Sequence, residues 1–222
     1  MTPPPRFAAV VFDMDGVIFD TEKLYFAAQG EVLRRRQHVY TPELARRIMG
    51  MPGVPAMALV RDALGLEDAA ETLYEESQVL FQELLKTELE MMDGAMELLE
   101  AARAQGLKTA LATSTKRDVA TKMLDAFDLP RRFDAILTFD DVEHGKPHPE
   151  MYLKACAALG VEPAQTLVIE DSVNGVRSAT AAGCYTVGVR HAHNQGVEFP
   201  PVAFEAESMR DGRLHGLVRG AV

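Results

Sequence analysis

The sequence predicts an α/β fold in which a doubly wound parallel sheet carries an all-helical subdomain inserted after its first strand. Two observations lead to this prediction. Short, continuous apolar runs alternate with amphipathic helical patterns, which is typical of βαβ units whose strands are buried on both faces. The first run is then followed by about 70 residues of helical pattern, far more than the dozen or so that one crossover needs.

Five apolar or β-branched runs have the length of buried strands. They span residues 7–12, 107–113, 135–139, 166–169 and 185–189. Between these runs, apolar residues recur at the i, i+3, i+4, i+7 spacing of a helix that covers a sheet. One such helix presents Tyr152 and Cys156 on its apolar face, and Gly160 supplies its C-terminal stop. The tail from residue 195 to 222 has weak patterning, and we assign no element there.

The inserted segment shows helical signals and no convincing strand. A long apolar stripe includes Leu73 and Phe81, and Thr41 followed by Pro42 is the N-cap and first residue of another helix. We therefore expect two domains, a sheet-bearing core formed by residues 1–16 and 90–222 and a helical domain formed by residues 17–89.

Composition excludes several classes of function. The chain has 222 residues, of which 23 are basic and 33 acidic, so its formal net charge is −10. Such an acidic surface should repel nucleic acids and anionic membranes, which bind through Lys and Arg patches. No run approaches the ~20 apolar residues of a membrane span, and the N-terminus shows no secretory signal. We expect a monomer or weak dimer that binds neither nucleic acid nor membrane.

The two cysteines, Cys156 and Cys184, lie in unrelated apolar stretches. This number and placement exclude a disulfide framework and a Cys-based zinc site, and they fit a reducing cytoplasm. We expect both to be core residues of a cytoplasmic protein.

The strongest local feature is Asp13-Met14-Asp15-Gly16, which directly follows the first predicted strand. Ligands of open parallel sheets bind beyond the carboxyl ends of the strands, so both carboxylates are placed for function. They repel one another unless a cation or a shared proton intervenes. Alone, the pair is equally compatible with an ordinary polar loop. An EF-hand loop is excluded, because a strand precedes the motif and Gly16 stands at its fourth position instead of the sixth.

Polar clusters follow two more strands. Thr113-Ser114-Thr115 ends the second strand, where hydroxyl and N–H groups could either bind phosphate or cap the next helix. Glu170-Asp171 ends the fourth strand and offers hard oxygen ligands of the kind Mg²⁺ prefers, although Asp171-Ser172 could also open the next helix. Asn174 lies in the turn that follows. Lys146 stands between Gly145 and Pro147, where the backbone is unusually restricted.

Together, these motifs resemble those of the haloacid dehalogenase-like (HAD) phosphohydrolase superfamily. All four of its motifs occur in order, and they cover nearly the whole chain. They are Asp13-x-Asp15-Gly16, Thr113, Lys146-Pro147 and Glu170-Asp171-Ser172-x-Asn174-Gly175. The sequences around Asp20-Thr21-Glu22 and around Lys146 are similar to those of the β-phosphoglucomutase/sugar-phosphatase branch. Within this branch, the pseudouridine-5′-phosphatase and 2-deoxyglucose-6-phosphatase types are the most similar. The resemblance implies a Rossmann-like core with residues 17–89 as its helical cap.

The resemblance also implies a mechanism. The enzyme would hydrolyse a small phosphorylated metabolite, a sugar phosphate or a nucleotide-like phosphomonoester, through an aspartyl-phosphate intermediate. Asp13 would be the nucleophile, and Asp15 would protonate the leaving group and then activate water. The residues implied for phosphate binding are Thr113, Ser114, Lys146 and Asn174. Those implied for Mg²⁺ are Asp13, Asp15 through its backbone carbonyl, Asp171, and Glu170 as a further ligand or a support.

Departures from the family pattern narrow the alternatives. An acid at Asp15 disfavours the ATPase and dehalogenase chemistries of the superfamily. A β-phosphoglucomutase-type sugar phosphomutase is the alternative, but residues 50–54 lack the Arg expected to grip a second phosphate, and Tyr25 replaces the expected hinge His. We expect residues 49–54 and the helix after Glu22 to face the leaving group. His191 and His193 lack a third ligand nearby, so we expect no metal there.

Overall fold

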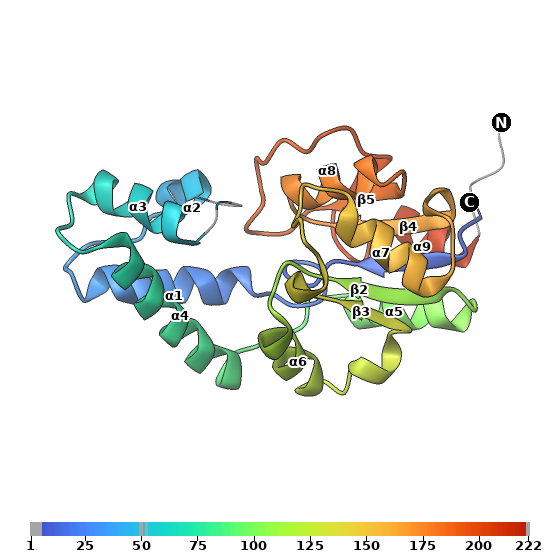
Figure 1. Ribbon diagram of the computed structural model, residues 1–222, viewed down its shortest axis with the longest axis horizontal. Coiled ribbons are helices and arrows are strands. Elements are labelled where there is room, and N and C mark those ends of the chain that lie inside the picture. The colour runs from blue at the N-terminus through green and yellow to red at the C-terminus, as the bar shows by residue number, and fades with distance from the viewer. Residues whose placement is uncertain (1–5, 49–50, 52, 221–222) are drawn as a thin grey trace. The chain divides into compact units, whose positions relative to one another are not determined.

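The chain forms two compact units in the computed structural model, which describes residues 6–48, 51 and 53–220 (Figure 1). One unit is Thr21–Glu90. The other combines Met1–Asp20 with Met91–Val222 and carries the sheet. The first unit is therefore an insertion into the second.

The sheet has six strands, all parallel, in the order β3-β2-β1-β4-β5-β6. The strands are β1 (Ala9–Phe12), β2 (Lys108–Ala112), β3 (Ala135–Leu137), β4 (Thr166–Glu170), β5 (Tyr185–Val189) and β6 (Phe204–Ala206). The first five coincide with the predicted runs, while β6 lies in the tail to which we assigned no element. Its three residues, FEA, are too few and too polar to show a strand period.

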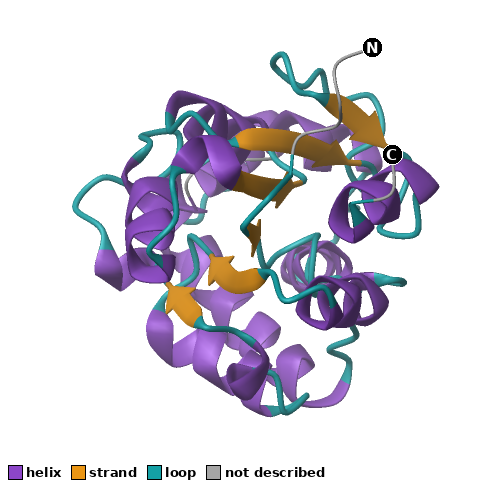
Figure 2. Cartoon of the chain, turned by 90° about the vertical axis from the view of Figure 1, so that its right-hand side faces the viewer, coloured by secondary structure: helices purple, strands orange, loops and turns teal. Residues whose placement is uncertain are grey.

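Helices lie on both sides of the row of strands (Figure 2), as the predicted doubly wound fold requires. The helices of this unit are α5 (Ala95–Ala104), α6 (Arg117–Asp125), α7 (Glu150–Leu159), α8 (Val173–Ala181) and α9 (Gly212–Arg219), with short 3₁₀ turns at Pro130–Arg132, Phe139–Asp141 and Pro163–Gln165. α7 packs on β1, β2 and β3, α8 packs on β4 and β5, and α5 contacts β2 and α9. The predicted α/β class is confirmed.

The core explains why the strand sequences are apolar throughout. Every residue of β1 and β4 is buried, since both faces of the sheet are covered. Cys156 of α7 and Cys184 before β5 belong to the same core cluster, with their sulfur atoms 3.9 Å apart. Both thiols are free, as predicted.

Two predicted helix boundaries have the local chemistry expected of them. Gly160 follows α7 with φ = 63°, the left-handed conformation that ends helices and that glycine adopts without strain. Ser172 precedes α8, and its hydroxyl accepts the N–H of Gly175 at 3.0 Å.

The inserted unit is helical over the residues described. Its helices are α1 (Glu22–Arg34), α2 (Pro42–Ile48), α3 (Gly53–Leu64) and α4 (Ala70–Thr87). α1 packs on α4, where the rings of Tyr25 and Phe81 stack with centroids 4.0 Å apart. The Leu44 N–H donates to Thr41 Oγ1 at 3.3 Å, as expected of an N-cap. Much of the segment predicted to face the leaving group, residues 49, 50 and 52, lies outside the described residues.

In the part of the chain that the structure describes, no helix is both long and apolar enough to cross a membrane.

Candidate active site

The sheet topology brings three of the predicted clusters to one edge. β1 lies between β2 and β4, where the order of the strands reverses, and ligands of such sheets bind at this point. Phe12 pairs with Leu111 of β2 and with Ile169 of β4. The residues that follow the three strands therefore leave the sheet side by side.

Lys146 joins the clusters of β1 and β4. Its Nζ donates to Asp13 Oδ1 at 2.5 Å, to Glu170 Oε1 at 2.7 Å and to the Ala112 carbonyl oxygen at 3.0 Å. The side chains of Lys146, Asp13 and Glu170 are only 5%, 9% and 0% exposed. A buried ammonium group thus lies between two buried carboxylates, which partly compensates their repulsion.

Glu170 is held by donors on both of its carboxylate oxygens. Oε1 accepts the Tyr152 hydroxyl at 2.6 Å in addition to Lys146. Oε2 accepts the N–H of Asp171 and both the N–H and the hydroxyl of Ser172, each at 3.0 Å. A Cβ on Gly175 would collide with this carboxylate, so only glycine leaves room for it. The protein therefore fixes Glu170 in one orientation.

The charges of this group are strongly interdependent. Burial, together with the neighbouring Glu170, Asp171 and Asp15, raises the pKa of Asp13 well above its usual value, although Lys146 opposes the shift. Burial would also raise the pKa of Glu170, but the Lys146 ammonium and the Tyr152 and Ser172 donors outweigh it and lower that pKa. The two carboxylates raise the pKa of Lys146 despite its burial. These opposite shifts favour the ionised form of Glu170 over that of Asp13.

Asp15 is oriented by two threonines. Its Oδ2 accepts the Thr115 hydroxyl at 2.8 Å and the Thr113 hydroxyl at 3.3 Å. The Thr115 N–H in turn donates to Thr113 Oγ1 at 2.9 Å. Thr113, a predicted phosphate-binding residue, thus contacts Asp15, and so does Thr115, which was not among the predicted site residues. Gly16 follows with φ = 74°.

Three acidic side chains could hold a metal ion. Asp13, Glu170 and Asp171 each present one carboxylate oxygen, and these oxygens lie within 4.8 Å of one another. Clustered hard oxygen donors fit Mg²⁺, which prefers carboxylates and keeps several waters. The donor set therefore suits the predicted cation.

Two of the predicted phosphate-binding residues lie at the margin of this group. Ser114 is exposed between Thr113 and Thr115, and Asn174 is half-buried in the first turn of α8.

Besides Thr115, Tyr152 and His191 were not among the predicted site residues. In the sequence, Tyr152 belongs to the apolar stripe of a helix, and this position does not indicate a role for its hydroxyl group. His191 approaches Asp171, with Nε2 2.9 Å from Oδ2. A signal for His191 did exist, since it follows the fifth predicted strand closely, as Asp13 follows the first.

Comparison with known proteins identifies the family. The profile of the haloacid dehalogenase-like hydrolases matches residues 10–189. The chain belongs to this family. The predicted resemblance is thereby confirmed.

The similar proteins include named phosphatases. A phosphorylated carbohydrates phosphatase of Thermotoga maritima is 41% identical over 85% of this chain and 88% of its own length. The validoxylamine A 7′-phosphate phosphatase of Streptomyces hygroscopicus subsp. limoneus is 31% identical over 85% of this chain and 88% of its own length. These names and the family bear out the prediction of a phosphomonoester hydrolase.

A crystal structure from Thermotoga maritima shares the fold. It is 32% identical, covers 96% of this chain and 97% of its own, and has a TM-score of 0.76. Its provisional name is beta-phosphoglucomutase. The likeness extends over both units of the chain.

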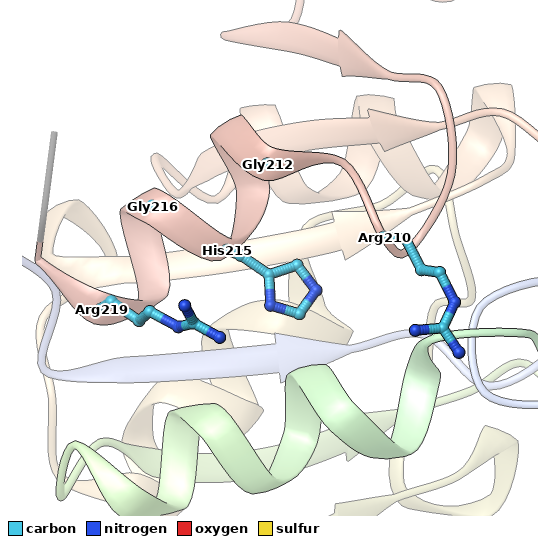
Figure 3. A pocket seen from close by; sticks show the side chains of 5 residues that line it. All are labelled: Arg210, Gly212, His215, Gly216 and Arg219. Carbon is cyan, nitrogen blue, oxygen red and sulfur yellow. The ribbon is translucent and has the colours of Figure 1, made fainter.

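A hollow of about 530 Å³ lies over α9 and is lined by Arg210, Gly212, His215, Gly216 and Arg219 (Figure 3). The Arg210 guanidinium there is bound by Asp93 at 2.7 Å and by Glu97 at 2.8 Å. These two carboxylates compensate the charge of Arg210.

Proposed function

We propose that this HAD enzyme is a Mg²⁺-dependent phosphatase of a small phosphorylated carbohydrate or related metabolite, acting through an aspartyl-phosphate on Asp13. The observation that carries the proposal is the convergence of Asp13, Asp15 and Lys146 where the strand order reverses. The name of the relative at 41% identity, a phosphatase of phosphorylated carbohydrates, supports this class of substrate.

In this proposal, a carboxylate oxygen of Asp13 attacks phosphorus in line with the leaving group. The bond from phosphorus to the leaving oxygen breaks as the new oxygen–phosphorus bond forms, which gives the aspartyl-phosphate. Lys146, bonded to Asp13 Oδ1, limits rotation of the nucleophile and supplies positive charge beside it. Water then attacks the same phosphorus, releasing inorganic phosphate and restoring Asp13.

Asp15 moves the protons of both steps. It gives its proton to the departing alkoxide and later takes one from the attacking water. The hydroxyls of Thr115 and Thr113, both bonded to Oδ2, support this assignment because they hold the carboxyl group in one orientation. A fixed proton donor is effective only if it stays within reach of the leaving oxygen.

The residues that would hold Mg²⁺ are Asp13, Asp171 and the backbone carbonyl of Asp15, with Glu170 as a further ligand or as support. When bound, the cation stabilises negative charge on the transferring phosphoryl group. The raised pKa of Asp13 supports a requirement for it, because a nearby positive charge favours the ionised carboxylate that the nucleophile must be.

The remaining polar residues complete the proposed phosphate site. Thr113, Ser114, Lys146 and Asn174 are proposed to bind the phosphoryl oxygens. The transition state of phosphoryl transfer spreads charge over these oxygens, so fixed donors contribute mainly by position and charge. The helical unit Thr21–Glu90 is proposed as the cap that selects the leaving group.

A sugar phosphomutase is the second candidate, favoured by the provisional name of the Thermotoga maritima structure. A panel of sugar phosphates and nucleoside 5′-monophosphates, assayed with and without Mg²⁺, separates the two activities. The phosphatase predicts stoichiometric release of inorganic phosphate in the presence of Mg²⁺ and no isomerised product. Isomerised sugar phosphate that depends on a bisphosphate activator would instead establish the mutase.

A further inference from the structure

His191 contacts the carboxylate of Asp171 from the loop that follows β5. Its Nε2 lies 2.9 Å from Asp171 Oδ2, and the two side chains are only 5% and 11% exposed. Buried polar side chains are nearly always hydrogen-bonded, and this contact satisfies part of the bonding capacity of both side chains. The contact therefore constrains both side chains.

The backbone determines which nitrogen of His191 carries the proton. The His193 N–H points at His191 Nδ1 at 3.2 Å, so Nδ1 is the acceptor. In a neutral imidazole the other nitrogen then bears the hydrogen, and Nε2–H donates to Asp171 Oδ2. The bond to Asp171 thus needs no positive charge on His191.

Asn194 connects the same loop to Asp171 through a second hydrogen bond. The His191 N–H donates to Asn194 Oδ1 at 2.9 Å, while Asn194 Nδ2 donates to the carbonyl oxygens of Asp171 at 3.1 Å and Val189 at 2.8 Å. Asn194 is 1% exposed. Asp171 is consequently held at its carboxylate by His191 and at its backbone by Asn194.

Gly16 packs against the contact between His191 and Asp171. A Cβ at Gly16 would collide with the Asp171 carboxylate and approach His191 Nε2 to 3.0 Å. The His191–Asp171 pair therefore packs directly against the loop that carries Asp13 and Asp15, and the Asp171 carboxylate has little room to rotate.

We propose that His191 is a positioning residue that holds the Asp171 carboxylate in the orientation that binds the divalent cation. This inference rests on the proposed Mg²⁺ site. Hydrogen-bond partners of a metal ligand fix its direction, and their loss typically weakens metal affinity by about 10- to 100-fold. His191 itself touches neither substrate nor reacting atoms in this role.

The test compares two substitutions of similar size in the full-length enzyme. His191→Gln keeps an N–H donor at about the reach of Nε2, whereas His191→Met removes the donor. Direct calorimetric titration of the metal-free proteins with Mg²⁺ alone gives the dissociation constant without reference to activity. His215→Met is the matched control, since it removes a histidine of α9 whose Nε2 contacts the carbonyl oxygen of Met209.

We expect His191→Met to raise the Mg²⁺ dissociation constant at least about tenfold. His191→Gln should stay within about threefold of the parent, and His215→Met should match it. A purely structural role would instead lower the melting temperature of the metal-free protein and leave Mg²⁺ affinity unchanged. Parent-like Mg²⁺ binding by His191→Met would overturn the role of His191 alone. If the parent enzyme itself failed to bind Mg²⁺, the metal assignment in the proposed function would be wrong as well.

Discussion

Tyr152 donates its hydroxyl hydrogen to Glu170 Oε1 at 2.6 Å, and both side chains are completely buried. The bond connects α7 to the end of β4. The same oxygen accepts Lys146 at 2.7 Å, so the position of the ammonium group depends on a contact made inside the hydrophobic core.

Tyr152→Phe removes this donor without changing the ring. Because a hydrogen bond to a charged group contributes about 1.5–3 kcal/mol, we expect the free energy of unfolding to fall by an amount in that range. We also expect kcat to fall, but by less than about tenfold. Chemical denaturation and steady-state kinetics measure the two effects. Tyr185→Phe, at a half-buried ring that packs against Phe7, is the control and should change neither. Equal stability of Tyr152→Phe and the parent would mean that the bond contributes nothing.

Lys146→Met leaves two buried carboxylates without their shared cation. Breaking a buried ion pair in this way costs about 3–5 kcal/mol, and activity should be lost with it. Lys122→Met, at an exposed position of α6, is the control. Denaturation midpoints of the metal-free proteins measure the cost.

The loss of stability in Lys146→Met should depend on pH in a defined direction. Lys146 helps to lower the pKa of Glu170 below its usual 4.5, so its contribution is present above that pH and fades as the pH falls. In Lys146→Met, burial acts on Glu170 without this opposition and favours the protonated carboxyl. The stability gap between parent and variant should therefore narrow as the pH is lowered from neutrality toward about 4.5. A gap that widens over this range contradicts the assignment.

Much of this arrangement could be predicted from the sequence, because its parts are local. Strands β1 and β2 end directly before Asp13 and Thr113, and β4 ends at Glu170. The carboxyl ends of these parallel strands meet at one edge of the sheet. Lys146 follows no such rule. The last strand before it, β3, ends at Leu137, well before Lys146, so only the resemblance to the family assigns Lys146 to the site.

What could not be predicted are contacts between distant parts of the chain. Thr115 reaches Asp15 across 100 residues, and Tyr152 reaches Glu170 from a helix face whose spacing indicates only burial. His191 and His193 lack a third metal ligand nearby in the sequence, which argues against a metal site there but says nothing about hydrogen bonds. The actual partner of His191 is a carboxylate, which ligand spacing cannot reveal.

Gly175→Ala tests the space that Glu170 occupies. Inside α8, alanine would normally stabilise the helix by about 0.5–1 kcal/mol relative to glycine. Here its Cβ meets the Glu170 carboxylate, so we expect destabilisation of about 1–3 kcal/mol and reduced kcat. Gly212→Ala, at the start of α9 where a Cβ meets nothing within 4 Å, should be neutral or stabilising. Thermal unfolding of the two variants compares them directly, and a stable, active Gly175→Ala would disprove the collision.

Glu150 accepts hydrogen bonds from the backbone of the loop that carries Lys146. Its carboxylate accepts the N–H groups of Glu143 at 3.0 Å and His144 at 2.9 Å. The Lys154 ammonium group, assisted by these N–H groups, lowers the pKa of Glu150 to about 2. The tie is thus present above the usual glutamate pKa of 4.5 and should be lost as the pH falls from there toward about 2.

Hydrogen exchange of the amides of Glu143 and His144 follows this tie directly. Glu150→Ala should expose both amides at neutral pH and lower kcat/KM by up to about tenfold, since Lys146 loses its fixed position. Lys154→Ala removes the ion pair and the Lys154 Nζ hydrogen bond to the Asp141 carbonyl oxygen at 2.8 Å, but it keeps the Glu150 carboxylate, so both amides should stay protected. Unchanged protection in Glu150→Ala would show that the loop is held by other contacts.

The central claim is that Asp13 carries the phosphoryl group and Asp15 the protons. The most direct measurement is a rapid-mixing assay of Asp15→Asn with p-nitrophenyl phosphate and Mg²⁺, because this leaving group departs with little help from an acid. We predict a burst of p-nitrophenolate close to one equivalent per enzyme, slow turnover afterwards, and a phosphoryl group on the acid-quenched peptide that contains Asp13. Asp13→Asn should give neither. A burst that survives in Asp13→Asn, or a phosphoryl group trapped on another residue, would contradict the mechanism.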